Sequence, residues 1–477
     1  MYYTRWYFDE IFRIIGQIIY YSSFVFLIPL ILSIILKEQT LFIGNYALSF
    51  LIVFLFGLIL YKFIPKNNFV ELSGIHYLLI VCGLWLIFCT VSTIPYYVFG
   101  YSFIDSFFDT MSLLTTTGTT TLPYIIDLTS FHVWRAILSW IGGIGIVLIA
   151  FYGLLNTNIF FSKKIAMAEG HDQMTNSYKG TIKALWIIYI VLTIIGIILL
   201  LLVGMDLLNS VTYTMSAIST TGHDMPNANY IYNGNIQLVI AFIILLGATS
   251  FVTHYKVYKE KNPLVYFKDP QFIFISVIIF IFFLIFYAYL HTTQTWQSIL
   301  GLIVGSMGGG FIVFSPEMIL GLAPLLFLLL LFVMFVGGAK GSTAGGITQE
   351  RFLLLIKSIF WQIKEIRLPD LSTISKKYDD RIIDDDEIKL LYFFVASYLF
   401  FIVFGVLVLT AYGYPLNTSI FEVISTQGNI GIPIGIAEYS MPLIPKIVLI
   451  LNMWVGRLEI IPIFGLIGML FQRTRVI

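Results

Sequence analysis

The chain has 477 residues, of which 58% are hydrophobic and 11% are charged, against about 45–50% apolar and about 25% charged residues in an average soluble domain. With a mean hydropathy of +0.92, a water-soluble globule of this size could not bury its apolar surface, so lipid must be part of its solvent. The formal net charge of +1 provides no basic field for nucleic acid. Composition therefore excludes a soluble enzyme, a nucleic-acid-binding protein and a disordered regulator, and indicates a lipid bilayer as the surroundings.

Ten apolar segments are candidates for crossing the bilayer, since a helix needs about 20 apolar residues to span about 30 Å of hydrocarbon. We expect these spans at residues 17–36, 41–63, 73–98, 130–158, 181–204, 235–255, 271–290, 319–357, 388–412 and 442–471. The eighth is too long for one crossing, and small residues from Gly337 to Gly346 interrupt it.

Shorter apolar segments lie between the third and the tenth spans, at residues 105–117, 208–221, 297–309 and 418–430. Segments of this length cannot cross a bilayer, so we expect re-entrant half-helices that enter the membrane and turn back. The predicted fold is an all-α polytopic membrane protein.

The basic residues orient the chain. Lysine and arginine cluster in the N-terminal segment and in alternate loops, at residues 61–66, 162–183, 256–268 and 351–389, and positive charge marks the cytoplasmic side of membrane proteins. The opposite loops are richer in acidic residues, which would concentrate cations at an outer vestibule. This pattern predicts that both termini are cytoplasmic. Acidic residues that merely tolerate translocation better than basic ones would give the same asymmetry.

Serine and glycine recur at one spacing in the four short segments. A serine precedes each aligned glycine by twelve positions, in the pairs Ser106–Gly118, Ser210–Gly222, Ser298–Gly310 and Ser419–Gly431. A second serine precedes the glycine by six positions in three copies (Ser112, Ser216 and Ser425), and Val304 replaces it in the other. The matched offsets predict a fourfold repeat of span, half-helix, glycine loop and span, which is the layout of a tetrameric cation channel joined into one chain.

The first serine of each copy is a candidate N-cap, because its hydroxyl can accept an N–H of the first helical turn. Ser106 with Asp109, and Ser419 with Glu422, have the spacing of a capping box. We expect each half-helix to begin at this serine and to end one or two residues before the glycine, a length of about 16 Å, or half a bilayer.

The glycine loops are expected to line an ion pathway. Main-chain carbonyl oxygens that point at a common axis can replace the hydration shell of a cation, and threonine hydroxyls and the negative ends of the half-helix dipoles add to the attraction. The alternative is four Thr/Gly-rich turns that only connect helices. The candidate selectivity filter consists of Thr116, Thr117, Gly118, Thr119, Thr220, Thr221, Gly222, His223, Gly308, Gly309, Gly310, Phe311, Asn429, Ile430, Gly431 and Ile432.

The break at Gly337–Gly346 leaves polar backbone groups inside the membrane, where they need partners or water. A loop of small residues below the filter could shift as a plug, and a close-packed helix interface is the alternative. Lys340 within it could block or gate the pore, or could pair with Glu350 and only set topology. Arg457 lies within the last span, and an ionisable side chain inside the membrane indicates a functional role. The alternative is that Arg457 only pairs with a neighbouring helix to stabilise the structure.

Five stretches resemble motifs of one family: TTTGTTTLP, SAISTTGHD, GGAKGSTAGGIT, STQGNIGIPIG and VGRLEI. They are similar to motifs of the Trk/Ktr/HKT superfamily of potassium transporters, most closely the prokaryotic TrkH/KtrB-type membrane subunit. The resemblance runs from about residue 73 to the end, and the two preceding spans are what the TrkH branch would add.

The resemblance implies four pseudo-repeats around one pore, with K⁺ as the transported ion and no organic cofactor. It places K⁺ at Thr117, Gly118, Thr221, Gly222, Gly309, Gly310, Ile430 and Gly431. The family's intramembrane gating loop corresponds to Gly337–Gly346, and the family's arginine that contacts this loop corresponds to Arg457. The gating residues are then Gly338, Lys340, Gly341, Ser342, Thr343, Gly345, Gly346 and Arg457. Two features depart from the family pattern: Lys340 inside the loop, and a third filter of Met307 and three glycines that lacks hydroxyl groups.

The resemblance also implies partners: a second copy of the chain, each protomer with its own pore, and a cytosolic ring of nucleotide-binding regulatory subunits of the TrkA/KtrA type. The expected division is 1–66 for two N-terminal helices and 67–165, 166–265, 266–380 and 381–477 for the four pore repeats. The expected function is potassium uptake across the cell membrane. The alternatives are a K⁺/H⁺ or K⁺/Na⁺ symporter on the same scaffold, or a non-conducting homologue plugged by Lys340.

Overall fold

The computed structural model describes residues 2–65, 72, 74–155, 178–223, 230, 232–311, 314–369, 374–379, 381–458, 460 and 463–464. The expected division points after residues 66, 165 and 380 lie outside these ranges. Apart from a hairpin of two short strands, β1 (Lys377–Tyr378) and β2 (Arg381–Ile382), the regular elements of the described part of the chain are helices.

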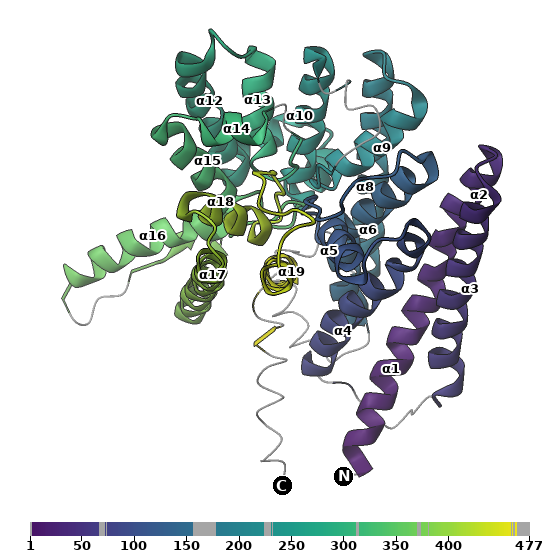
Figure 1. Ribbon diagram of the computed structural model, residues 1–477. Coiled ribbons are helices and arrows are strands. Elements are labelled where there is room, and N and C mark those ends of the chain that lie inside the picture. The colour runs from purple at the N-terminus through teal and green to yellow at the C-terminus, as the bar shows by residue number, and fades with distance from the viewer. Residues whose placement is uncertain are drawn as a thin grey trace.

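Two long N-terminal helical stretches pack along one side of the molecule (Figure 1). The first runs without interruption through α1 (Tyr2–Ser22), η1 (Ser23–Phe26) and α2 (Leu27–Ile35), so it begins earlier than the expected residue 17. The second is α3 (Thr40–Phe63). Glycine allows the two backbones to approach closely: a methyl group on Gly57 would lie 2.4 Å from the amide nitrogen of Tyr20.

Each pore repeat has a first long helix, a short buried pore helix and a second long helix or helix pair. The first repeat contains α4 (Gly74–Ser92), η2 (Ile94–Phe99), α5 (Phe103–Leu114) and α6 (Thr129–Leu155). The second contains α8 (Tyr178–Leu202), α9 (Leu207–Ile218), α10 (Gly234–Ala248) and α11 (Phe251–Glu260). The third contains η4 (Pro263–Lys268), α12 (Pro270–Leu290), α13 (Trp296–Gly305), α14 (Pro316–Leu320), α15 (Pro324–Val336) and α16 (Gln349–Ile366). The fourth contains α17 (Asp385–Ala411), α18 (Leu416–Gln427) and α19 (Leu443–Leu458).

Among the described residues, six helices are long and apolar enough to span a bilayer. The expected span at 235–255 is not one straight helix, because α10 and α11 meet at an angle of 94°. The expected segment at 319–357 is divided into α14, α15 and α16, with the small-residue loop between the last two. The outer helices α8, α12 and α17 leave large apolar side chains exposed, such as Ile194, Phe280 and Phe400, as surroundings of lipid require.

The four pore helices are α5, α9, α13 and α18, and they begin earlier than the serine pattern predicts. The N-caps are Ser102, Asp206 and Thr295, each of which accepts an N–H three residues later, and Pro415, which has no capping side chain. The expected capping box at Ser106 and Asp109 is therefore wrong. The hydroxyl of Ser106 donates instead to the carbonyl of Ser102 at 2.8 Å, and Ser102 forms the cap with Asp105.

Candidate functional site

The pore helices end four or five residues before the aligned glycines, not one or two. In three repeats the cause is a left-handed residue that ends the helix: Thr116 (φ 58°), Thr220 (φ 58°) and Asn429 (φ 53°). The next N–H in each case bonds back to the carbonyl of the serine six positions before the glycine, from Thr117 to Ser112 at 2.7 Å, from Thr221 to Ser216 at 2.9 Å and from Ile430 to Ser425 at 2.9 Å. This is the Schellman ending of a helix. Threonine is strained at positive φ, and such strain is typical of functional sites.

Beyond these endings the aligned glycines form a closed ring around one axis. A methyl group on Gly118 would lie 2.1 Å from the carbonyl oxygen of Thr221, and one on Gly222 would lie 1.7 Å from that of Gly309. One on Gly310 would lie 2.9 Å from the oxygen of Ile430, and one on Gly431 would lie 1.7 Å from that of Thr117. Each glycine thus faces the carbonyl of the residue before the next repeat's glycine, and the fourth repeat returns to the first. No side chain fits at these positions.

In the second and fourth repeats the serine six positions before the glycine holds the segment that follows. The hydroxyl of Ser216 accepts the N–H of Gly222 at 3.1 Å, and that of Ser425 accepts the N–H of Ile432 at 3.0 Å. In the second repeat the Ser216 hydroxyl also bonds with Nδ1 of His223 at 3.0 Å. The sequence pattern identified these two serines together with Ser112, whose hydroxyl has no hydrogen-bond partner among the described residues.

The third segment differs from the other three. It has valine in place of the serine, and Gly308, Gly309 and Gly310 all have positive φ, of 138°, 139° and 46°. The N–H of Gly310 bonds to the carbonyl of Gly305 at 3.3 Å, so the acceptor lies five positions before the aligned glycine and not six as in the other repeats. Three glycines are therefore required by the backbone path in this segment, which has no side-chain hydroxyl.

The loop Gly337–Gly346 lies directly against the candidate filter segments and the break between α10 and α11. A methyl group on Gly345 would lie 2.3 Å from the carbonyl oxygen of Gly428, and one on Gly308 would lie 3.0 Å from Cβ of Ala344. The loop N–H groups of Ala339 and Thr343 donate to the carbonyls of Ala248 and Gly247, at 2.9 and 3.0 Å. The Thr343 hydroxyl lies 2.8 Å from the carbonyl oxygen of Ile218, at the end of the second pore helix. The break between α10 and α11 leaves backbone carbonyls of the second repeat without an intrahelical partner. Backbone N–H groups of the loop in the third repeat bond to these carbonyls.

Arg457, near the end of α19, is buried and reaches the same loop. Its guanidinium donates to the carbonyl of Thr343 at 2.7 Å and to those of Gly142 and Gly143 at 2.8 and 2.9 Å. The arginine therefore connects the fourth repeat, the loop of the third and α6 of the first. Its neighbour in sequence, Glu459, lies outside the described residues.

The side chain of Lys340 pairs with Glu350, the partner that the sequence offered as one of two alternatives. The ammonium lies 3.4 Å from Oε1 of Glu350, and Arg381 of the hairpin lies 2.6 Å from the same oxygen. All three side chains line a cavity of about 770 Å³ between the loop, α11 and the hairpin. The main-chain N–H of Lys340 donates to Gln271 at 2.8 Å. The lysine is thus held at the side of the loop by an acid shared with the hairpin.

Comparison with known proteins places this arrangement in a family. The sequence model of the TrkH family, described as cation transport proteins, matches residues 45–302 and 271–469. The chain belongs to the TrkH family of cation transport proteins. It is a transporter and not an enzyme, as expected, and an all-α polytopic membrane protein of the expected fold class.

Relatives of this TrkH-family chain match it over nearly its whole length. An uncharacterized cation transporter of Methanocaldococcus jannaschii is 31% identical over 476 residues, which cover 98% of this chain and 96% of the relative. The Trk system potassium uptake protein TrkG of Escherichia coli is 28% identical, with 96% and 97% of the two chains covered. The crystal structure of the potassium transporter TrkH from Vibrio parahaemolyticus matches with a TM-score of 0.85 at 26% identity and covers 98% of this chain and all of that one.

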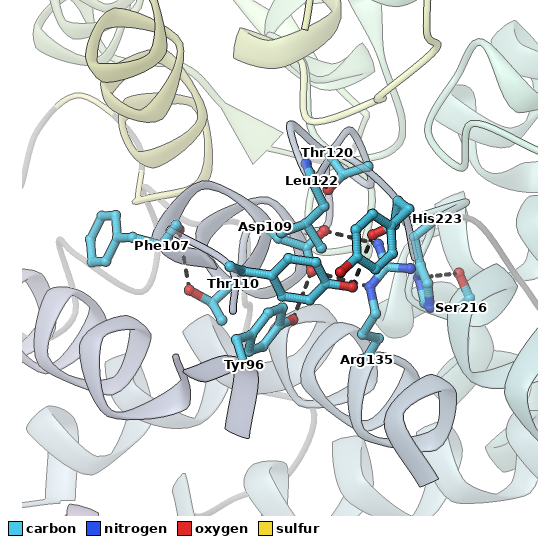
Figure 2. A network of polar contacts seen from close by, with 11 residues as sticks. Tyr96, Phe107, Asp109, Thr110, Thr120, Leu122, Arg135, Ser216 and His223 are labelled. Carbon is cyan, nitrogen blue, oxygen red and sulfur yellow. Dashed lines mark hydrogen bonds and ion pairs between the residues drawn. The ribbon is translucent and has the colours of Figure 1, made fainter. Parts of the chain in front are cut away.

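A buried ion pair braces the first pore helix of the TrkH-family chain. Arg135 of α6 donates to both carboxylate oxygens of Asp109, at 2.9 and 3.1 Å, and the hydroxyl of Tyr96 donates to the same carboxylate at 2.7 Å. Figure 2 shows the carboxylate between these partners, with the Ser216–His223 pair beyond the guanidinium. The sequence drew attention to Asp109 only as part of a capping box.

Three glycines in the second helices of the repeats were not identified as functional from the sequence. A methyl group on Gly142, Gly247 or Gly456 would lie 2.3, 2.4 or 2.0 Å from the carbonyl oxygen of Leu114, Ile218 or Gln427. Each of these oxygens belongs to the residue four positions before the filter glycine of its own repeat, at the end of the pore helix. The signal was present as a glycine 24 or 25 positions after the aligned glycine in the first, second and fourth repeats.

Proposed function

We propose that this TrkH-family chain conducts K⁺ across the cell membrane through the ring of Gly118, Gly222, Gly310 and Gly431, and that the loop Gly337–Gly346 gates the pathway. The observation that carries the proposal is the closed succession of glycine and carbonyl contacts from each repeat to the next. Ring carbonyls of this kind replace the water around a cation, and the names of the relatives from Escherichia coli and Vibrio parahaemolyticus favour potassium as that cation.

In this mechanism the cation enters from the acidic side of the membrane and loses its water at the filter. The main-chain oxygens of Thr117, Thr221, Gly309 and Ile430 form one layer of the filter and alternate with the glycines. The negative ends of the four pore-helix dipoles point at the same region and lower the cost of desolvating the cation. The ion then meets the loop at Gly345 and Ala344, which pack against the filter segments.

Arg457 holds the loop closed in this proposal. Its bond to the Thr343 carbonyl ties the loop to α6 through Gly142 and Gly143. Opening requires that these three carbonyls lose their donor or move together with it. We assign both termini to the cytoplasm from the distribution of basic residues. We further propose that the chain forms a homodimer and that a cytosolic nucleotide-binding subunit supplies the force for opening, as the family resemblance implies.

A symporter on the same scaffold is the second candidate. Glu422 of α18 is buried, and its Oε2 atom has no hydrogen-bond partner among the described residues. It occupies the position that Asp109 holds in the first repeat, where Arg135 neutralises the charge. Such a carboxyl is what a mechanism that couples K⁺ to H⁺ would use. The plugged homologue is the less favoured alternative, since Lys340 pairs with Glu350.

The test is ion uptake into proteoliposomes that contain the purified chain. Under a K⁺ or Rb⁺ gradient we expect the chain alone to show basal uptake without any pH gradient, because the closed loop opens only part of the time without the regulatory subunit, and at least tenfold less uptake of Na⁺. Uptake of K⁺ that requires an inward H⁺ gradient, and that is lost in Glu422→Gln, would instead support symport. No uptake of any alkali cation in the wild type, restored in Lys340→Ala, would support the plugged homologue.

A further inference from the structure

The amide side chain of Asn429 connects two filter segments and a long helix. It is fully buried, and its Nδ2 atom lies 3.1 Å from Oγ1 of Thr117 in the first repeat and 3.0 Å from the main-chain oxygen of Met453 in α19. A third oxygen, the carbonyl of Thr426, lies at the limit of 3.5 Å. Because a carbonyl oxygen only accepts, the atom that faces Met453 must be the nitrogen, and the orientation of the amide is fixed.

The hydroxyl groups of Thr117 and Thr115 continue the hydrogen bond from Asn429 in a fixed direction. Thr115 lies 2.8 Å from the helix carbonyl of Met111 and 3.0 Å from the hydroxyl of Thr117. Since Thr115 has one proton and the carbonyl can only accept, Thr115 donates to Met111 and Thr117 donates to Thr115. The Thr117 oxygen is then free to accept from Asn429. The chain of donors therefore has a single direction, from Asn429 to the end of the first pore helix.

Thr117 is also the residue whose carbonyl faces Gly431 in the ring. The first and fourth segments are thus in contact twice. The backbone at Gly431 lies close to the carbonyl of Thr117, and the Asn429 side chain donates to the hydroxyl of Thr117. The other three joints of the ring have no side-chain hydrogen bond between segments among those described. At the position of Asn429, Thr116 has an unpartnered hydroxyl, Thr220 bonds to the carbonyl of its neighbour Ser219 at 2.7 Å, and Gly308 has no side chain.

We propose that Asn429 is a positioning residue for ion selectivity, which braces the carbonyl of Thr117 at a fixed distance from the fourth segment. This inference rests on the proposed filter. The discrimination between K⁺ and Na⁺ depends on how closely the ring of oxygens can contract or expand around the ion, and a brace across one joint limits both movements. Asparagine suits the position because it tolerates the left-handed conformation that the helix ending requires.

The experiment compares Asn429→Gly with Thr116→Gly in full-length protein in proteoliposomes. Both changes place glycine at a left-handed residue two positions before a filter glycine, so they share any effect on backbone freedom. Only the first removes a bond between repeats. We expect the K⁺/Na⁺ uptake ratio of Asn429→Gly to fall about tenfold below that of Thr116→Gly, which is about 1.4 kcal/mol. If Asn429→Gly does not fold, Asn429→Ser replaces it, because one hydroxyl proton cannot serve two acceptors.

A double mutant separates bracing from a local packing effect. Thr117→Val removes the acceptor, so Asn429→Gly added to it should lower the ratio no further. Equal ratios for Asn429→Gly and Thr116→Gly, or independent effects of Asn429→Gly and Thr117→Val that multiply, would overturn the inference. Gly118→Ser and Gly431→Ser are measured in parallel. If they leave the ratio unchanged, the filter assignment itself fails; if they abolish selectivity while Asn429→Gly matches Thr116→Gly, only the bracing role fails.

Discussion

The ammonium group of Lys446 in α19 lies 2.6 Å from Oδ1 of Asp105 in α5, and both side chains are buried. The pair joins the last repeat to the first across 341 residues of sequence. Asp105 also accepts the hydroxyl groups of Thr121 and Ser102, at 2.7 and 2.5 Å. A single carboxylate thus bonds to the capping serine of the first pore helix, to a threonine after the aligned glycine and to a lysine of the last repeat.

Replacement of Lys446 by methionine should strongly destabilise the protein, because Asp105 would keep a buried charge without its cation. Removal of one partner of such a pair costs about 3–5 kcal/mol. We expect Lys446→Met to lower the unfolding temperature in detergent by more than the double change Lys446→Met with Asp105→Asn does. If the double mutant were the less stable of the two, the pair would not be acting as a unit.

Arg457→Ala should increase ion flux. The change removes the donor shared by the carbonyls of Thr343, Gly142 and Gly143, so the loop loses its tie to the first and fourth repeats. Uptake of ⁸⁶Rb⁺ into proteoliposomes should rise several-fold. Arg457→Lys keeps the charge but loses the planar guanidinium with its several donors. Its flux should therefore lie between the fluxes of the wild type and of Arg457→Ala. Unchanged flux in Arg457→Ala, with the protein folded, would show that this contact does not hold the gate.

Lys340→Ala and Glu350→Ala should change flux in the same direction. The two side chains form a pair 3.4 Å apart, and either change frees the loop from the acid that it shares with Arg381. A blocking lysine predicts the opposite signs, since loss of Lys340 would open the pore and loss of Glu350 would release the ammonium into it. Measurement of ⁸⁶Rb⁺ uptake for both variants therefore distinguishes a latch from a plug.

Gly456→Ala should destabilise the junction of α19 with the fourth pore helix. The added methyl would lie 2.0 Å from the carbonyl oxygen of Gln427, and overpacking of this kind costs about 1–3 kcal/mol. Gly44→Ala is the matched control, because it lies in helix α3 with no atom near the added methyl; it should leave stability equal or raise it by up to about 1 kcal/mol. Thermal unfolding of the two variants measures the difference, and equal stabilities would contradict the close approach.

The hairpin should stay docked across the physiological pH range. Lys376 donates to Asp385 at 2.6 Å and pairs with Glu365 at 2.7 Å. The hydrogen bond to Asp385 raises the pKa of Lys376, and the bond from Lys376 lowers the pKa of Asp385. Stabilisation from a raised lysine pKa is lost only as the pH rises through that pKa, and stabilisation from a lowered aspartate pKa is lost only as the pH falls through it. Amide exchange of Tyr378 and Ile382, corrected for intrinsic rates, should therefore be constant from about pH 5 to pH 9 and should increase on stronger acidification. Loss of protection from amide exchange between pH 6 and pH 8 would show that the pairing of Lys376 with Asp385 and Glu365 does not hold the hairpin in place.

The sequence predicts the ring of glycines because close approach at the filter requires glycine at one offset in every repeat. It mispredicts the start of the pore helices because their N-caps are four different residue types, Ser102, Asp206, Thr295 and Pro415. The N-cap lies 16 positions before the aligned glycine in three repeats and 15 positions before it in the third. It mispredicts the ends because Thr116 and Thr220 adopt a left-handed conformation that threonine rarely has.

Contacts between distant repeats leave no local pattern in the chain. The bonds from Arg457 to Gly142 and from Asn429 to Thr117 join residues more than 300 positions apart. Family resemblance implied that Arg457 contacts the loop, but nothing in spacing or composition indicated its bonds to α6. The pairing of Lys340 with Glu350 spans ten residues, and the sequence offered it only as one of two possibilities.

The most direct test of the central claim is the K⁺/Na⁺ uptake ratio of Gly118→Ser and Gly431→Ser in proteoliposomes. Their side chains would project toward the carbonyls of Thr221 and Thr117. Gly413→Ser is the control, because it has a positive φ of 91° but open space around it. The account predicts that both filter variants lose at least tenfold in the ratio while the control keeps the wild-type value. A wild-type ratio in folded Gly118→Ser and Gly431→Ser would contradict the assignment of the glycine ring as the selectivity filter.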